Sequence, residues 1–293
     1  DTIRHRHFWR ATVTASKWGK MKQMNDNMVA FIGAGNMATA IISGLIRNKF
    51  NNSHVFVSSP EEDHLEKLKG NFSVNVSKDN REVVNSVSTL VLAVKPNVVE
   101  AVLDELSTEI PKNDPLLISI VAGYKIASIE DKLDSKLKIV RAMPNTPASI
   151  GMGVSALTAN QWIVEEDKSV PESVFGSIGL TCWLEESAFD LFTALIGSGP
   201  AYIFYLIEAL QEAAKGLNLD ESTTKELITE MIKGSSTLAN QSEDSLSLLR
   251  EKVTSPGGVT EKALEILNRK EVGRSIIEAI LEASDKSKTL GGS

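Results

Sequence analysis

The feature that most constrains this chain is a glycine motif that lies between an apolar run and an amphipathic segment. The apolar run is Met28–Ile32, and the segment Asn36–Arg47 carries apolar side chains at helical spacing. In such a strand–turn–helix unit, the first glycine allows a tight turn, the second lets a pyrophosphate approach, and a final alanine permits close packing. The sequence therefore predicts a dinucleotide site, with a ligand-free glycine turn as the alternative. Its residues are Gly33, Ala34, Gly35, Asn36, Met37 and Ala38.

Downstream of this motif, short apolar runs alternate with amphipathic segments as far as Arg141. The run Thr89–Val94 is uninterrupted, which is typical of a buried central strand. The alternation predicts an α/β fold with a Rossmann-type, doubly wound parallel sheet. The other expected strands are His54–Val57, Phe72–Val76, Leu116–Val121 and Lys138–Arg141, and the expected helices are Glu62–Lys69, Val98–Ile110 and Ile126–Leu133.

After about Leu184 the strand signals end and only helical patterns follow. The chain has 293 residues, a length that fits two domains better than one core. We therefore expect an NAD(P)-binding domain over 28–184 and an all-helical domain over 185–293. The expected helices are Phe189–Leu210, Lys215–Leu219, Ser222–Gln241, Leu246–Val253, Glu261–Leu267 and Arg274–Ser284.

The first 27 residues differ in composition from the rest of the chain. They hold six lysines and arginines and two acidic residues, without the long apolar stretch of a secretory signal. A transit peptide, an expression leader and sequence upstream of the true start are all open, with Met21, Met24 and Met28 as plausible starts. We expect a disordered leader or non-native extension over 1–27.

Composition disfavours several other classes of function. The net charge is −7 and aromatic residues make up 5%, so a nucleic-acid partner is not expected. A single cysteine, Cys182, excludes a disulfide framework and favours a cytoplasmic location, and we interpret it as a core residue. We expect no membrane partner, because no apolar run looks long enough to span a bilayer. No metal site is expected either, since His54 and His64 are too far apart in sequence to form a helical pair.

Polar residues follow the second strand at the edge where parallel sheets bind ligands. Ser58 and Ser59 stand there, in place of the acid that usually bonds the ribose 2′-hydroxyl of NAD. Two hydroxyls without a carboxylate can hydrogen-bond a 2′-phosphate without repelling it, which favours NADPH as the cofactor, with NADH as the alternative. Glu61 and Glu62 lie close by and weaken this inference, and no arginine is near.

Small and charged residues follow the next two strands at the same edge. The central strand ends in Ala93, Val94, Lys95 and Pro96. Lys95 places a cation at the rim of the expected site, and a solvated lysine or a structural ion pair is equally open. Ala122 and Gly123 are small enough for a nicotinamide to approach. The loop Arg141–Pro147 is expected to be structural, and Glu185, Glu186 and Asp190 are expected to form a solvated surface.

The most specific motif lies in the helical half, at Thr254–Thr260 (TSPGGVT). A rigid Ser-Pro-Gly-Gly loop before a helix exposes several backbone amides, and such a nest binds a carboxylate or phosphate. Thr260 can cap the helix or bond a ligand, and geometry alone favours the cap.

Taken in order, these motifs resemble those of the pyrroline-5-carboxylate reductase family. The resemblance covers about Met28 to Ser284 and includes Gly197–Tyr202 (GSGPAY). It implies NADPH on the Gly33–Ala38 turn, with Ser59 near the 2′-phosphate and Asn80 near the adenosine. It also implies that Ala93–Pro96 and Ala122-Gly123 flank the pyrophosphate and nicotinamide.

The same resemblance implies roles for the helical half. The imino acid's carboxylate would lie on the amides of Gly257 and Gly258, with Ser255 nearby. Thr260 would bond the ring nitrogen, which makes Thr260 and Lys95 the catalytic candidates. Lys95 resembles a family lysine that pairs with an acid, here Glu243. The helical domain would form an intertwined homodimer, and such dimers often assemble as rings of five, giving a decamer.

The implied reaction is NAD(P)H-dependent reduction of 1-pyrroline-5-carboxylate to L-proline, the last step of proline biosynthesis. A protonated imine is already electrophilic, so positioning carries most of the catalysis and no histidine is needed. One alternative is a related NADP-dependent imine or hydroxyacid reductase, which is disfavoured because Ala201–Leu210 contains no lysine. A non-catalytic NAD(P)H-binding sensor need not keep Ser255–Thr260. A lipid- or vitamin-B6-binding protein is disfavoured by the βαβ pattern.

Overall fold

The computed structural model describes residues 13–14, 27–85 and 87–290. The chain separates into two compact units. The first is Asp1–Gly197 together with Ser284–Ser293, and the second is Ser198–Ala283. The prediction for residues 1–27 falls almost wholly outside the described residues, apart from the strand Val13–Thr14 and residue Asn27.

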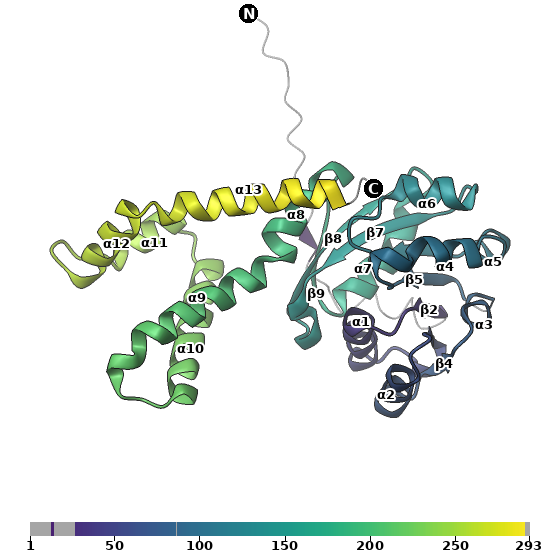
Figure 1. The fold of residues 1–293 in the computed structure, drawn as a ribbon, viewed down its shortest axis with the longest axis horizontal. Coiled ribbons are helices and arrows are strands. Elements are labelled where there is room, and N and C mark those ends of the chain that lie inside the picture. The colour runs from purple at the N-terminus through teal and green to yellow at the C-terminus, as the bar shows by residue number, and fades with distance from the viewer. Residues whose placement is uncertain (1–12, 15–26, 86, 291–293) are drawn as a thin grey trace, which may run out of the picture. The chain divides into compact units, whose positions relative to one another are not determined.

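The first unit is built on one mixed sheet (Figure 1). Its strands are β1 (Val13–Thr14), β2 (Val29–Ile32), β3 (Val55–Ser58), β4 (Asn75–Ser77), β5 (Thr89–Leu92), β6 (Leu116–Ser119), β7 (Ile139–Pro144), β8 (Gly153–Ala159) and β9 (Gly179–Trp183). Within the described residues, the order is β1-β9-β8-β7-β6-β5-β2-β3-β4. The strands from β4 to β7 are all parallel, and their order reverses between β2 and β5. This is the doubly wound dinucleotide-binding order, which confirms the predicted fold class.

Helices cover both faces of this sheet. They are α1 (Asn36–Arg47), α2 (Glu62–Phe72), α3 (Asn80–Val84), α4 (Val99–Glu105), α5 (Glu109–Asn113), α6 (Ile126–Leu133), α7 (Ser169–Gly176) and α8 (Phe189–Phe192). Short 3-10 turns, η2 to η6, lie at Asn52–His54, Pro96–Val98, Thr146–Ile150, Glu165–Lys168 and Glu186–Ala188, and a π-helical turn, η7, lies at Thr193–Gly197.

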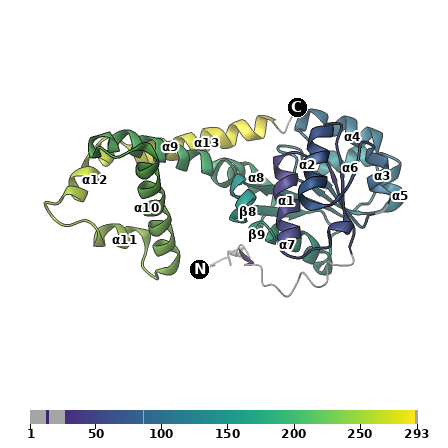
Figure 2. The same ribbon diagram turned by 90° about the horizontal axis from the view of Figure 1, so that it is seen from below.

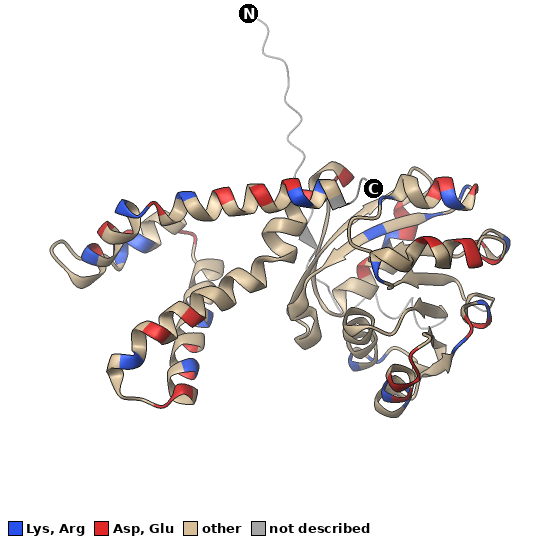
Figure 3. Ribbon diagram, viewed as in Figure 1, with Lys and Arg blue, Asp and Glu red and all other residues tan. Residues whose placement is uncertain are grey.

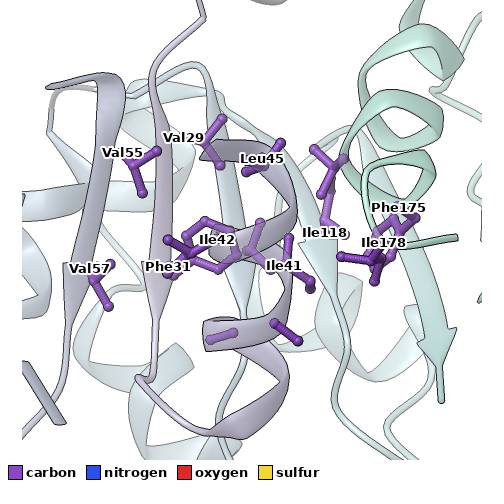
Figure 4. Packing of buried hydrophobic residues seen from close by; sticks show 14 of the residues in the cluster. Val29, Phe31, Ile41, Ile42, Leu45, Val55, Val57, Ile118, Phe175 and Ile178 are labelled. Atoms are coloured by element: carbon purple, nitrogen blue, oxygen red, sulfur yellow. The ribbon is translucent and has the colours of Figure 1, made fainter. Parts of the chain in front are cut away.

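Alternate residues of the central strands supply two separate cores. On β2, Val29 and Phe31 pack with α1, α2 and α7 on one face, whereas Ala30 and Ile32 pack with α4 and α6 on the other. All four side chains are at most 1% exposed. Figure 4 shows the first core, in which Phe31 lies against Ile42 of α1. Burial on both faces explains why these strands read as continuous apolar runs rather than as alternating ones.

Several predicted boundaries differ from the structure. Phe72–Val76 was expected as a strand, but α2 continues to Phe72 and β4 begins only at Asn75. The alternation of apolar and polar residues over Phe72–Val76 arises because the last residue of α2 stands close in sequence to the short edge strand β4. Val98–Ile110 is not one helix but the turn η3 followed by α4 and α5. Phe189–Leu210 was expected to be interrupted at Gly197–Pro200, and it consists of α8, the π-helical turn η7 and α9, which continues to Ala213.

Strands β8 and β9 were not predicted. β8 returns antiparallel to β7 through η4, and β9 runs parallel to β8 after α7 crosses over. At the far edge, Val13 and Thr14 pair antiparallel with Cys182 and Thr181 of β9. The described part of the N-terminal extension is thus a strand of the sheet.

The second unit consists of helices. They are α9 (Gly199–Ala213), the turn η8 (Ala214–Leu217), α10 (Glu221–Gln241), α11 (Leu246–Lys252), α12 (Val259–Arg269) and most of α13 (Val272–Leu290). α9 and α10 are in contact with each other, and the turn η8 connects them (Figure 2). The predicted all-helical character of this half is confirmed.

One described helical stretch, Glu186–Leu217, has the length and apolar composition of a membrane span. This contradicts the expectation that no apolar run is long enough. The stretch is longer than the expected helix Phe189–Leu210 because η6 precedes it, and α9 and η8 extend it to Leu217. A core helix of a water-soluble protein passes the same test of length and composition.

Candidate active site

The predicted glycine turn lies at the reversal point of the sheet, between β2 and β5. Gly33 has a φ of +105°, a conformation that side chains disfavour. A Cβ at this residue would lie 2.5 Å from the carbonyl oxygen of Ala93. The backbone amide of Gly33 donates to the carbonyl of Ser58 at 2.8 Å, and that of Ala93 donates to Ile32 at 2.8 Å. Glycine is therefore required here so that β2, β3 and β5 can end side by side.

The N-terminus of α1 is open, as a phosphate site requires. Gly35 is the N-cap residue and supplies no capping side chain, and the first turn has no acidic residue. A Cβ at Gly35 would meet no atom within 4 Å. The first amides of a helix lack intrahelical partners and carry partial positive charge. Ala38, 1% exposed, packs into the core beneath. The turn therefore fits a dinucleotide pyrophosphate.

The residues expected near the adenosine form a bonded chain at the ends of β3 and α3. The hydroxyl of Ser58 donates to Asn80 Oδ1 at 2.7 Å, and Asn80 Nδ2 donates to Glu105 Oε2 at 2.9 Å. Asn80 is half-buried and begins α3. Its side chain thus has a structural task in addition to the cofactor contact implied by the resemblance.

Ser59, expected near the 2′-phosphate, is bonded to an acid that the sequence offered only as a neighbour. Its hydroxyl donates to Glu61 Oε2 at 2.6 Å, and the amide of Glu61 donates back to Ser59 Oγ at 3.3 Å. This hydrogen bond is the main cause that lowers the pKa of the Glu61 carboxyl. Ser59 is 2% exposed, so Glu61 covers its hydroxyl.

The remaining rim residues lie where the sequence put them, at the ends of β5 and β6. Lys95 is exposed and precedes η3, whose Pro96 ends strand pairing. Its positive charge contributes a little to the lowered pKa of Glu61. Gly123 has a φ of +75°, and Ala122 beside it is exposed. Lys95 belongs to the first unit and Glu243 to the second, so their pairing stays a prediction.

The loop before α12 differs from the expectation in one respect. Gly258, not Thr260, is the N-cap of this helix, so Thr260 lies in the first turn and the prediction of a threonine cap is wrong. Gly257, with a φ of +71°, turns the backbone, and a Cβ at Gly258 would lie 2.8 Å from the carbonyl of Ser255. Gly257 supplies the positive φ of this tight loop, and at Gly258 a side chain would not fit beside the Ser255 carbonyl.

A carboxylate already lies on the loop. The amide of Gly257 donates to Glu261 Oε2 at 2.7 Å. Sequence reasoning did not single out Glu261, although an acid three residues after the N-cap is the familiar signal for such a return bond. Glu261 also lines a pocket between α11 and α12 with Arg250, Thr254 and Leu264.

Two acids expected on a solvated surface have structural partners instead. Glu186 accepts from Arg141 Nη1 at 2.9 Å and from the amide of Ile126 at 3.0 Å. Arg141 is 5% exposed and lies over the Phe189 ring. Asp190 accepts from the Ser287 hydroxyl at 2.7 Å. The expectation was wrong because the partners come from segments distant in sequence.

The expected loop Arg141–Pro147 is partly strand, because β7 continues to Pro144, and in its remainder Asn145 has structural partners. Asn145 Oδ1 accepts from the amide of Val154 at 2.8 Å, and its Nδ2 donates to the carbonyl of Ile196 at 3.1 Å. These two bonds tie the loop to β8 and to the π-turn η7.

A doubly wound sheet with an open glycine turn at its reversal point defines a dinucleotide-binding protein of the Rossmann class. A family model for NADP oxidoreductases, coenzyme F420-dependent, matches residues 28–123, and one for pyrroline-5-carboxylate reductase dimerisation matches 186–290. A curated pyrroline-5-carboxylate reductase of Pseudomonas aeruginosa is 35% identical over 91% of this chain and 98% of its own length. The chain therefore belongs to the pyrroline-5-carboxylate reductase family.

Solved structures agree with this assignment. A pyrroline-5-carboxylate reductase from Coxiella burnetii superposes with a TM-score of 0.84 at 37% identity, covering 90% of this chain and 98% of that one. The enzyme from Plasmodium falciparum, solved with NADP bound, superposes with a TM-score of 0.82 at 30% identity, covering 92% and 99%. The chain is an NADP-dependent oxidoreductase that acts on a C=N bond, and it forms a homo-oligomer.

Proposed function

We propose that the two units divide the binding tasks of pyrroline-5-carboxylate reduction. The turn Gly33–Ala38 and the rim residues of the first unit hold NADPH. The loop Ser255–Thr260 of the second unit holds the imino acid. The observation that carries the second assignment is the bond from the Gly257 amide to a carboxylate, that of Glu261, at 2.7 Å. An amide turned toward one carboxylate is suited to receive another, so the substrate carboxylate takes this place when it displaces Glu261.

Thr260 is the proposed partner of the ring nitrogen. Because Gly258 caps the helix, the Thr260 hydroxyl is not used for capping, and among the described residues it has no hydrogen-bond partner. Its position two residues after the N-cap sets it beside the amides proposed to bind the carboxylate. A hydroxyl there orients the imine nitrogen and supports its protonated form.

The chemistry asks little of the protein beyond this positioning. When bound, NADPH supplies the hydride that adds to the C=N carbon. The loop amides fix the carboxylate, and Thr260 fixes the nitrogen, so the ring has two anchors and one orientation. Holding reacting atoms in near-attack geometry lowers the barrier without a strong acid or base. Lys95, an exposed cation at the rim of the first unit, is proposed to assist by charge.

The oligomer is proposed to be a homodimer, with a decamer of five dimers as its larger form. Support comes from α9, where Ile203, Phe204 and Tyr205 are 45%, 58% and 75% exposed. Figure 3 shows how few charged residues this helix carries. The expected location is the cytoplasm, in keeping with a single cysteine and no disulfide pair.

Absorbance of NADPH during reduction of 1-pyrroline-5-carboxylate tests these assignments. Loss of one hydrogen bond to a charged group in Thr260→Ala should lower kcat/KM by about ten-fold or more. Thr260→Ser keeps the hydroxyl and should retain most of the activity. If Thr260→Ala has the kcat/KM of the parent enzyme, Thr260 has no place in the mechanism.

A further inference from the structure

At the end of β3, where the adenosine ribose is proposed to bind, a carboxylate lies beside the hydroxyl of Ser59. Glu61 lies three residues beyond the end of β3, yet its side chain folds back to Ser59. Two bonds fix this arrangement, one from the Ser59 hydroxyl at 2.6 Å and one from the Glu61 amide at 3.3 Å. The acid is therefore held at the strand end, although the strand end itself has none.

In dinucleotide-binding sheets, the side chain at this strand end reads the ribose. An acid there accepts a hydrogen bond from the 2′-hydroxyl of NAD, whereas a 2′-phosphate is accommodated by a nearby arginine. Here the Ser59 hydroxyl donates its hydrogen bond to Glu61, so a 2′-phosphate receives that bond only if it displaces the Glu61 carboxylate. No arginine bonds Ser59 or Glu61 in the described part of the chain.

The charges around Glu61 do not cancel its own. His64 Nδ1 lies 3.7 Å from Glu61 Oε2, and the charge of Lys95 acts on Glu61 only weakly. Lys78 is paired with the neighbouring acid, Glu62, at 2.8 Å. The bond from Ser59 lowers the pKa of Glu61, so this carboxylate stays ionised at neutral pH. A 2′-phosphate placed here meets a negative charge.

We propose that Glu61 determines the choice between the two nicotinamide cofactors. Bonded to Ser59, its carboxylate accepts the ribose 2′-hydroxyl of NADH and opposes the 2′-phosphate of NADPH, so the enzyme binds both. This inference rests on the proposed cofactor site at the ends of β2 and β3. It adds Glu61 to the two serines and predicts a smaller preference for NADPH over NADH than the serines alone imply.

Titration of nicotinamide fluorescence, without imino acid, gives the dissociation constants of NADPH and NADH separately. Glu61→Gln should bind NADPH about ten-fold more tightly than the parent does, because one like charge is removed, and should bind NADH more weakly, because a neutral amide replaces the charged acceptor of the 2′-hydroxyl. Glu61→Lys should shift the ratio further toward NADPH. Glu62→Gln is the matched control, since Glu62 is the next acid and is bonded to Lys78 rather than to Ser59. Its ratio should equal that of the parent.

A thermal unfolding midpoint of Glu61→Gln equal to that of the parent, together with measurable binding of both dinucleotides, shows that the variant is folded. An NADPH-to-NADH ratio equal to that of the parent in both Glu61 variants overturns the inference. So does an equal shift in Glu62→Gln, because the effect is then general charge rather than Glu61. If the parent binds neither dinucleotide, the cofactor site itself is wrong and the inference falls with it.

Discussion

The two units of this chain stabilise themselves in different ways. In the sheet unit, Phe31, Leu45, Leu92 and Phe175 are completely buried by their own chain. In the helical unit, Thr224 is the one described residue that is more than nine-tenths buried. Several of its large apolar side chains, among them Phe204, Leu238 and Ile277, are more than half exposed.

The difference shows where each unit finds its hydrophobic partner. Apolar burial stabilises by about 25 cal/mol per Å², and it is the main favourable contribution to folding. The sheet unit gains it within one chain. The helical unit matches a dimerisation family, so we expect its exposed apolar surface to be buried against other copies of the chain. Folding and association are then expected to be coupled in the helical unit and not in the sheet unit.

The largest expected effect comes from placing a charge on the exposed apolar surface. Phe204→Asp should abolish the oligomer, since burying an unpaired carboxylate in an interface costs about 3 kcal/mol or more. Activity should fall with the oligomer, and light scattering coupled to gel filtration measures the mass. Glu208→Ala on the same helix is the control and should leave the mass unchanged. If Phe204→Asp has the same mass as the parent enzyme, the exposed apolar surface of α9 is not buried by oligomerisation, and the proposed difference between the two units is wrong.

The next largest effect concerns the glycine turn of the sheet unit. Gly33→Ala should destabilise the unit by about 3 kcal/mol or more, because the methyl meets a carbonyl and the residue has a positive φ. Thermal unfolding measures this loss.

Gly35→Ala is its counterpart, because its Cβ would meet nothing and its φ is −72°. Stability should stay near that of the parent, while NADPH binds about ten-fold more weakly, since the methyl stands where a phosphate approaches. A Gly33→Ala protein as stable as Gly35→Ala would contradict the packing described for this turn.

A pair of leucine truncations compares the two units directly. Leu45→Ala removes a side chain that is 0% exposed and should cost about 3 kcal/mol at every protein concentration. Leu238 is 56% exposed within its own chain, so Leu238→Ala should act through association. Its loss of stability should therefore depend on protein concentration. Urea unfolding at two concentrations checks both, and identical concentration dependence would show that the units do not differ.

The smallest expected effect is at Cys182 on β9. Burial raises the pKa of this thiol, so at a given pH less of it is the reactive thiolate. Alkylation by iodoacetamide near neutral pH should be several-fold slower in the folded protein than in urea, and should quicken as pH rises. Equal rates in both states would mean that β9 does not protect the thiol.

Much of the sheet unit could be predicted because its signals are local. Gly33 adopts a φ of +105°, which by itself favours glycine, and the run Thr89–Val94 is uninterrupted because both of its faces are buried. β8 and β9 were missed because they depend on distant partners. β9 pairs with β8 and with Val13–Thr14, which is far away in sequence.

The candidate site divides in the same way. The turn Gly33–Ala38 and the loop Thr254–Thr260 could be found from spacing alone. The hydrogen bonds from Ser59 to Glu61 and from the Gly257 amide to Glu261 could not be predicted. A side-chain hydrogen bond depends on the rotamer of the side chain, which the order of residues in the sequence does not give. Thr260 was misjudged as a cap because glycine and threonine both occur at the N-cap, and the sequence alone does not decide whether the helix begins after Gly258 or after Thr260.

The sequence by itself determined the two-part plan, the position of the dinucleotide turn and the loop rich in amides. Each of these follows from which residues tolerate a tight turn or lack a side chain. Only the tertiary structure decided that Arg141 is buried against Glu186, that Glu61 covers Ser59, and that the helical unit buries so little of its own apolar surface. These depend on contacts between distant segments, and a linear pattern does not record distance in space.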